Sequence, residues 1–145
     1  MIICFTGQPN SGKTTLANEL KKHFVNNSLS CEVLDGDILR SIYNNTDYTI
    51  FGRKRNVSLA FDLAKKLSNE KNVVIVSLVS PFREIRELLK NDSNFIVKEI
   101  FLHSTRKRDG RMVIYYEPPL KNYLEIDTDK HNVVESLNLV INYIK

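Results

Sequence analysis

The chain has 145 residues, of which 42% are hydrophobic and 26% charged, and its formal net charge is +4. This composition is typical of one folded domain with a sizeable core and excludes a disordered chain. No apolar run approaches the roughly 20 residues that span a membrane, so we expect no membrane partner. The basic residues are scattered and form no stripe with interleaved aromatics, so we expect no nucleic-acid partner. We therefore predict a single domain over residues 1–145.

The two cysteines, Cys4 and Cys31, both lie in apolar stretches with the pattern of strands. Such thiols are typically buried and reduced, as in proteins of a reducing compartment. The first residues already have a strand pattern, so we expect no cleavable signal. These features together predict a cytoplasmic protein.

The first predicted strand, residues 1–6, leads directly into the segment Gly7-Gln8-Pro9-Asn10-Ser11-Gly12-Lys13-Thr14. A helical pattern near 13–25 follows, so strand, loop and helix occur in the order of a G-x-x-x-x-G-K-T phosphate-binding loop. In such a loop, backbone N–H groups and the positive helix N-terminus surround a phosphate. Lys13 would reach the β- and γ-phosphates, and the Thr14 hydroxyl would ligate Mg²⁺. The alternative is a turn without a ligand, and the ordered context favours a nucleoside triphosphate site.

Further strand patterns lie at Cys31–Leu34, Val73–Val79, Phe95–Leu102 and Tyr123–Ile126, with helical patterns near 37–45, 53–70, 82–90 and 131–144. Strands that are continuously apolar, such as Val73–Val79, are typical of a parallel sheet covered on both faces. We therefore predict an α/β fold, a three-layer α/β/α sandwich with a five-stranded parallel sheet. Ligands of such sheets bind at the carboxyl ends of the strands, so functional residues should follow each strand.

Two carboxylates follow the second strand, because Asp35 and Asp37 flank a single glycine. Phosphoryl transfer needs a carboxylate near Mg²⁺ or near the attacking hydroxyl, and we predict that Asp37 is catalytic and ligates the metal. The alternative is that Asp37 serves only as the N-cap of the next helix. Arg40 shares a helix face with Asp37 and is predicted to bind an acceptor phosphate.

The third strand is followed by Ser80 and Pro81. We predict that Ser80 is the N-cap of the next helix and that Pro81 lies in its first turn. Arg83 and Arg86 follow one turn apart, and the sequence leaves open whether they face the site or solvent.

Taken together, these segments resemble the adenylylsulfate (APS) kinase family. The matching segments, in order, are the phosphate loop, Leu34–Arg40 (LDGDxxR), Tyr48-Thr49 ahead of Arg53 and Asn56, Ser77–Arg83, Tyr116-Glu117-Pro118-Pro119 and Ile126-Asp127-Thr128. The resemblance implies a P-loop nucleoside triphosphate hydrolase fold of the nucleotide-kinase type. It also implies transfer of the ATP γ-phosphoryl group, with Mg²⁺, to the 3′-hydroxyl of a 5′-modified nucleotide such as adenylylsulfate. The family commonly forms homodimers, so a homodimer is implied as well.

The resemblance also assigns residues to a site. It places Asp37 near the acceptor hydroxyl and Mg²⁺, with Thr14 as the second metal contact, and it makes Tyr48 a stacking partner of the acceptor base. The implied acceptor-binding residues are Asp35, Arg40, Tyr48, Arg53, Asn56, Val79 and Ser80. The implied ATP-binding residues are Gly7, Gln8, Pro9, Asn10, Ser11, Gly12, Lys13, Thr14, Thr15 and Arg108, and the catalytic residues are Asp37 and Lys13.

The chain departs from the family in three places. Arg55, Ser58 and Leu59 stand where the family carries a Glu and an Arg pair. Much of the long basic lid is absent, which should exclude water less completely and raise unproductive ATP hydrolysis. The second aromatic residue of the acceptor base clamp has no counterpart, and Tyr115 or Met112 are the candidate substitutes.

These departures leave other functions open. One is a kinase that acts on another nucleotide derivative, such as a cytidine diphosphoramidate, and another is a nucleotide-binding module with little catalysis. A GTP-dependent switch is disfavoured, because the chain has no Asn-Lys-x-Asp motif beyond a poor match at Leu89–Asp92.

Overall fold

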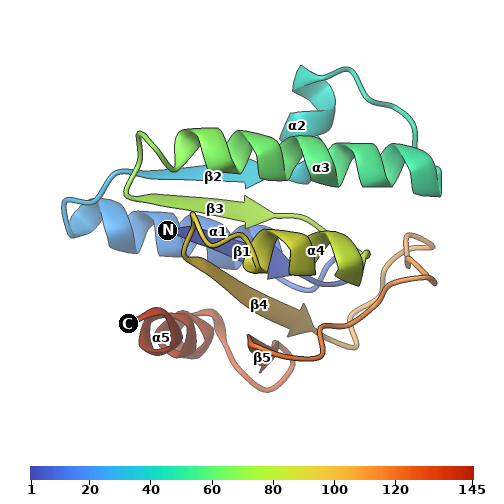
Figure 1. The fold of residues 1–145 in the computed structure, drawn as a ribbon. Helices are drawn as coiled ribbons and strands as arrows, with labels where there is room; N and C mark the ends of the chain where they lie inside the picture. The colour runs from blue at the N-terminus through green and yellow to red at the C-terminus, as the bar shows by residue number, and fades with distance from the viewer.

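A computed structural model describes residues 1–145 and contains five strands and five helices that alternate through most of the chain (Figure 1). The strands are β1 (Ile2–Thr6), β2 (Cys31–Asp35), β3 (Val73–Ser77), β4 (Val97–His103) and β5 (Tyr123–Asp127). The helices are α1 (Lys13–Asn26), α2 (Gly36–Ile42), α3 (Ile50–Leu67), α4 (Arg83–Lys90) and α5 (Val133–Ile144). No helix is long and apolar enough to cross a membrane.

All five strands pair in parallel, in the order β2-β3-β1-β4-β5. The strand β1 is central, because it pairs with β3 on one side and with β4 on the other. The carboxyl ends of the strands therefore meet at one edge of the sheet, where the loops after β1, β2 and β3 lie together (Figure 1). The predicted α/β class and five-stranded parallel sheet are confirmed.

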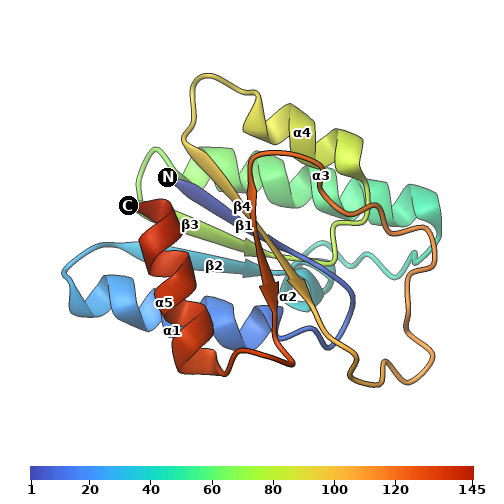
Figure 2. The same cartoon turned by 90° about the horizontal axis from the view of Figure 1, so that it is seen from below.

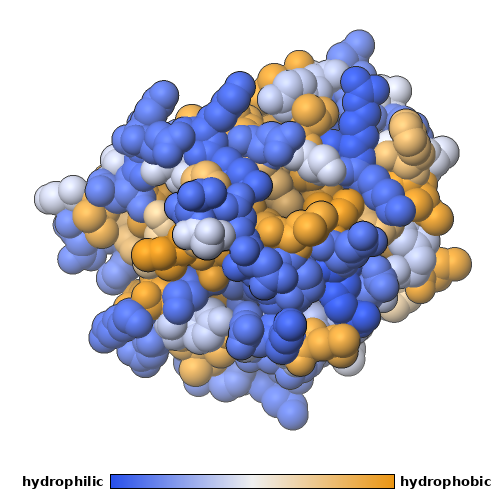
Figure 3. Space-filling model, in the orientation of Figure 1, coloured by the Kyte–Doolittle hydropathy of each residue, from blue (hydrophilic) through white to orange (hydrophobic).

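Helices cover both faces of the sheet, as the two perpendicular views show (Figures 1 and 2). Successive residues of a strand point to opposite faces, so β1 sends Ile3 and Phe5 into the core under α1 and α5, and Ile2 and Cys4 into the core under α3. Two apolar cores, one on each side of the sheet, give the predicted three layers. Cys4 and Cys31 are both buried and unpaired, as predicted. On the face that carries α3 and α4, hydrophilic side chains surround smaller hydrophobic patches (Figure 3).

One helix start differs from the alternative considered for Asp37, and another differs from the prediction for Ser80. The N-cap of α2 is Asp35 and not Asp37, because Asp35 Oδ1 accepts a hydrogen bond from the backbone N–H of Asp37 at 3.0 Å. Ser80 does not cap α4, which begins at Arg83, and Pro81 lies outside its first turn. The reason is the backbone of Ser80, whose φ of 47° turns the chain before the helix begins.

Other boundaries shift by two or three residues. The helix α3 begins at Ile50, three residues early, because Thr49 Oγ1 accepts a hydrogen bond from the N–H of Gly52 at 3.2 Å and caps it there. The connection between β4 and β5, residues 104–122, contains neither helix nor strand. The resemblance to the kinase family predicts a shortened lid at this connecting segment.

Candidate functional site

The loop after β1 has the conformation that its glycines allow. Gly7 and Gly12 have φ angles of 152° and 98°, values that residues with a Cβ rarely adopt. A Cβ on Gly7 would lie 2.2 Å from the carbonyl oxygen of Leu102. The loop ends at the first turn of α1, so its backbone N–H groups and the helix N-terminus form a positive site for a phosphate.

Lys13 is buried at the base of this loop, with 8% of its surface exposed. Its Nζ donates to the carbonyl oxygen of Gln8 at 2.8 Å and to Ser11 Oγ at 3.3 Å. Burial lowers the pKa of Lys13 to about 8, against the opposing effect of Asp35, and the Arg108 charge lowers it further. An arriving polyphosphate would favour the charged ammonium, so this lysine is suited to bind the triphosphate.

Thr14, Asp35 and Asp37 bring oxygen atoms together beside the loop. Thr14 Oγ1 donates to Asp35 Oδ2 at 3.0 Å, which joins α1 to the end of β2. Asp37 is exposed, and its carboxylate makes no hydrogen bond or ion pair. Mg²⁺ takes oxygen ligands and usually keeps several waters, so one hydroxyl and one or two carboxylates fit it. No group of three or more His, Cys, Asp or Glu side chains is present, so a metal here would need phosphate oxygens and water as further ligands.

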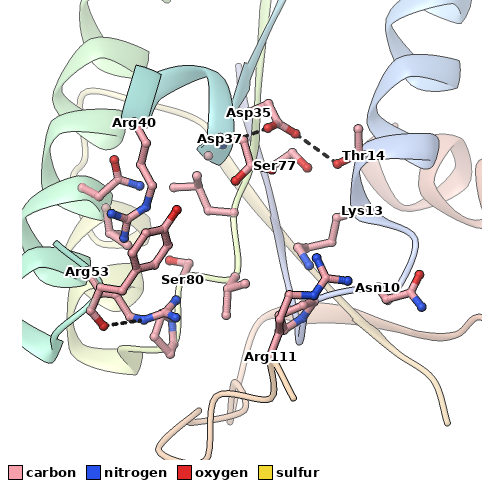
Figure 4. A pocket seen from close by; sticks show the side chains of 18 of the residues that line it. Asn10, Lys13, Thr14, Asp35, Asp37, Arg40, Arg53, Ser77, Ser80 and Arg111 are labelled. Carbon is pink, nitrogen blue, oxygen red and sulfur yellow. Dashed lines mark hydrogen bonds between the residues drawn. The ribbon is translucent and has the colours of Figure 1, made fainter. Parts of the chain in front are cut away.

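A cleft of about 640 Å³ joins the phosphate loop to the carboxyl ends of β2 and β3 (Figure 4). All of the predicted acceptor-binding residues line it, namely Asp35, Arg40, Tyr48, Arg53, Asn56, Val79 and Ser80. Pro9, Asn10, Lys13, Thr14 and the predicted catalytic Asp37 line it as well. The donor loop and the predicted acceptor residues thus share one cavity.

Tyr48 lies at the mouth of the cleft with 60% of its surface exposed. The guanidinium carbon of Arg40 is 4.0 Å from the centre of its ring, and that of Arg53 is 5.5 Å away. Arg40 is held by a hydrogen bond to the carbonyl oxygen of Asp47 at 2.9 Å. The ring therefore belongs to a cationic cluster, and its predicted stacking on a base would use the ring area that the arginines leave free.

Three polar side-chain atoms in the cleft wall are buried without a partner: Asn56 Oδ1, Ser77 Oγ and Ser80 Oγ. Buried polar atoms are nearly always hydrogen-bonded, so these three mark positions where a ligand or water would bind. Ser77 was not among the predicted site residues, because a serine that ends a strand has no distinctive pattern. It enters the site through the sheet, where it is in register with Asp35.

Several arginines lie where the sequence did not place them. Arg111, which was not predicted, lines the cleft on the side opposite Arg40 and Arg53 (Figure 4). Arg108 does not line the cleft, since it donates to the carbonyl oxygens of Arg106 and Ser104 at 2.5 and 2.7 Å, and its contact with ATP stays a prediction. The sequence could not find Arg111, because its position depends on an irregular segment.

The 104–122 segment is held against the phosphate loop. Gln8 Nε2 donates to the carbonyl oxygen of Val113 at 2.8 Å, and Gln8 Oε1 accepts from the N–H of Val113 at 2.9 Å. Neither candidate for the second base-stacking residue lines the cleft: Met112 is exposed, and Tyr115 stacks on Phe82 with ring centres 5.9 Å apart. The segment therefore contributes a cation to the cleft and no aromatic plate.

Neither Arg83 nor Arg86 lines the cleft. Arg83 Nε donates to the carbonyl oxygen of Pro118 at 2.7 Å. Arg86 is 2% exposed and forms an ion pair with Glu99, with Nε and Oε1 2.7 Å apart. Both of the alternatives that the sequence left open were wrong for Arg86, because its partner lies on β4, thirteen residues away in sequence.

Comparisons with known proteins agree with this arrangement. The family model described as adenylylsulphate kinase matches residues 1–118. The adenylyl-sulfate kinase of Thermodesulfovibrio yellowstonii is 29% identical over 168 residues, which cover 99% of this chain and 83% of that protein. A probable adenylyl-sulfate kinase of Archaeoglobus fulgidus is 30% identical over 152 residues, which cover 90% of this chain and 97% of that protein.

Solved structures show the same fold. A cysteine-to-alanine mutant of the Mycobacterium tuberculosis APS kinase is similar with a TM-score of 0.83 at 24% identity, over 99% of this chain and 95% of that one. The same kinase in complex with AMPPNP and APS has a TM-score of 0.82 at 21% identity, over 99% of this chain and 96% of that one. The P-loop fold that the resemblance implied is confirmed.

Proposed function

Since the chain belongs to the adenylylsulfate kinase family, we propose that it transfers the γ-phosphoryl group of ATP to the 3′-hydroxyl of adenylylsulfate. The observation that carries this proposal is the single cleft, which joins the phosphate loop to every predicted acceptor-binding residue. A phosphate loop alone supports only triphosphate binding. A second set of polar and cationic side chains within the same cavity supports a bound acceptor and direct transfer between the two.

On the donor side, the loop amides and Lys13 would hold the β- and γ-phosphates of ATP. Thr14 and Asp37 would hold Mg²⁺, with Asp35 beside them as the acceptor of the Thr14 hydroxyl. When bound, the metal would neutralise part of the negative charge of the phosphates. Lys13 and Thr14 belong to one rigid helix start, so the protein positions the phosphoryl group with little reorganisation.

On the acceptor side, Asp37 would orient or deprotonate the attacking hydroxyl, because its carboxylate is free and lies between the loop and the acceptor residues. Arg40 and Arg53 would bind the acceptor phosphate and sulfate, and Tyr48 would contact the base. Asn56 Oδ1 and Ser80 Oγ are buried without partners in the same wall, so the acceptor would supply the hydrogen bonds that they lack.

We assign a further role to Arg111, which enters the cleft from the shortened segment. Phosphoryl transfer is promoted by cations that surround the transferred group, and arginine serves this purpose in many such enzymes. Gln8 anchors the segment on the phosphate loop through Val113, two residues from Arg111. A short lid that is tied to the loop would thus bring a positive charge to the site where the long lid is missing.

The test combines the purified protein with Mg·ATP and each of three acceptor conditions: adenylylsulfate, a cytidine diphosphoramidate and no acceptor. We expect ADP release to be stimulated by adenylylsulfate, with a product heavier by one phosphate in mass spectrometry. Stimulation by the cytidine compound alone would transfer the proposal to the alternative acceptor. ATP binding without stimulated release by either compound would reject a kinase and favour a binding module.

The homodimer and the cytoplasmic location that the sequence analysis expected stay predictions. The homodimer rests on the resemblance, and the location rests on the buried, reduced cysteines and the expected lack of a signal. A single chain tests neither. Sedimentation of the purified protein, with and without ATP, would measure the first of them.

A further inference from the structure

Arg86 is a buried charged side chain, with 2% of its surface exposed, and it has no role in the proposed site. Its Nε donates to Glu99 Oε1 at 2.7 Å, and Glu99 also pairs with Lys90 on its other side. A buried ion pair is weak evidence for stability, because both ions lose their hydration. The ion pair by itself therefore does not explain why a guanidinium lies between α4 and β4.

The other nitrogens of Arg86 bind the backbones of two loops that border the cleft. One terminal nitrogen donates to the carbonyl oxygen of Ser80 at 2.5 Å, and the other donates to the carbonyl oxygen of Glu117 at 2.5 Å. Ser80 lines the cleft, and Glu117 belongs to the 104–122 segment that also carries Arg111. One planar guanidinium thus joins both loops, with the fixed donor geometry that distinguishes arginine from lysine.

Ser80 depends on such support. Its φ of 47° lies in the left-handed region, which residues other than glycine keep only when their surroundings hold them there. Its carbonyl oxygen accepts a hydrogen bond from Arg86 and a longer one, at 3.3 Å, from Thr6 Oγ1, whose single hydrogen is shared with the carbonyl oxygen of Val79 at 2.8 Å. In this conformation Ser80 Oγ is buried in the cleft wall without a partner. The contacts to the carbonyl therefore determine where the hydroxyl lies.

We propose that Arg86 is a positioning residue for the acceptor, which fixes Ser80 and the 104–122 segment relative to each other without touching a substrate. This inference rests on the proposed function, because it takes Ser80 to be an acceptor contact. Glu99 keeps the guanidinium in its plane and orientation. Lys90 binds the same carboxylate and Glu87, and it contacts the 104–122 segment only near its end beside β5, at the carbonyl oxygen of Lys121, so it reaches neither Ser80 nor Glu117.

The kinetic test compares Arg86→Lys with Lys90→Met as its matched control. Arg86→Lys keeps a positive charge beside Glu99 and removes the fork that reaches both carbonyls. We expect the acceptor KM to rise about tenfold, because this change corresponds in free energy to roughly one charged hydrogen bond. The ATP KM and kcat should change less than about threefold. Lys90→Met should lower the melting temperature and leave the acceptor KM unchanged. An unchanged acceptor KM in Arg86→Lys, or an equal rise in Lys90→Met, would overturn the positioning role.

A second measurement does not depend on catalysis. The backbone N–H of Glu117 donates to the carbonyl oxygen of Pro81 at 2.9 Å, so its hydrogen exchange reports whether the two loops remain joined. We expect exchange at this amide to be about tenfold faster in Arg86→Lys and unchanged in Lys90→Met. Unaltered exchange in Arg86→Lys rejects the positioning role, whereas a parent protein that phosphorylates no acceptor rejects the proposed function.

A third variant keeps the inference testable if Arg86→Lys does not fold. Thr6→Val removes the hydroxyl that donates to the carbonyl oxygen of Val79 at 2.8 Å and to that of Ser80 at 3.3 Å, and it preserves the shape of the buried side chain. We expect a rise in the acceptor KM of about threefold to tenfold, without an effect on the ATP KM. A folded Thr6→Val protein with parental acceptor KM would contradict the claim that contacts to the backbone carbonyls at Val79 and Ser80 set acceptor affinity.

Discussion

Replacement of Asp37 by asparagine should separate catalysis from folding in this protein. The Asp37 carboxylate is exposed and bonds to no other group, and the capping bond of α2 uses the backbone N–H of residue 37, which the replacement retains. The free energy of unfolding should therefore change by less than about 0.5 kcal/mol. A residue that takes or orients the acceptor proton contributes about 10²–10⁴-fold to the rate, or roughly 3–5 kcal/mol at 1.36 kcal/mol for each tenfold.

Asp35→Ala is the matched comparison for this prediction. Asp35 caps α2 and accepts the hydroxyl of Thr14, so its loss should cost about 1–2 kcal/mol in stability and lower the melting temperature by roughly 2–8 °C. The assay measures ADP release at saturating adenylylsulfate and ATP, beside ATP affinity and thermal melting. Near-normal turnover of a folded Asp37→Asn protein would refute the assignment of Asp37, and a large loss of stability would refute the structural part of the reasoning.

Three further predictions concern the phosphate loop and the segment above it. Gly7→Ala should destabilise the fold by about 2 kcal/mol or more and abolish ATP binding, since its Cβ would lie 2.2 Å from a carbonyl oxygen. Gly110→Ala is the matched control, because Gly110 has φ 74° and nothing lies within 4 Å of its added Cβ. In chemical denaturation its cost should be only about 1–2 kcal/mol. Because the pKa of Lys13 is lowered to about 8 in the folded protein, the unfolded chain holds the proton more tightly, and stability should rise between about pH 8 and pH 10.5. In urea titrations of the ATP-free protein at both ends of this window, the free energy of unfolding should rise by about 2–3 kcal/mol in the parent protein and stay constant in Lys13→Met. An equal rise in the variant would contradict the assignment of this effect to Lys13. Gln8→Ala removes both hydrogen bonds to Val113, so ADP release without acceptor should increase severalfold, and an unchanged rate would show that the segment does not restrict water.

The sequence predicted the sheet and the phosphate loop because each has a local signal. The run of valine and isoleucine in β3 and the spacing of glycines, lysine and threonine in the loop depend on neighbouring residues only. The resemblance then placed Arg40, Asn56 and Ser80, and the structure brings them into one cleft with Lys13. Their roles as substrate contacts stay predictions.

Errors arose where a distant contact outweighs a local preference. Serine is a good N-cap, but Ser80 adopts a left-handed conformation in which its carbonyl oxygen accepts a hydrogen bond from Arg86. The sequence left open whether Arg86 faces the site or solvent, whereas its position is set by Glu99 on a strand that follows it in the chain.

By itself, the sequence determined the α/β class, the parallel sheet and the position of the triphosphate site, because periodicity and the phosphate-loop spacing act over a few residues. The tertiary structure alone decided how residues 104–122 lie, since that segment has no periodicity and is held by contacts to Gln8, Arg86 and Asn10 from elsewhere in the chain. Those contacts place Arg111 in the cleft and tie the segment to Ser80. The sequence alone predicts a shortened lid, whereas only the tertiary structure shows that this segment is hydrogen-bonded to the phosphate loop.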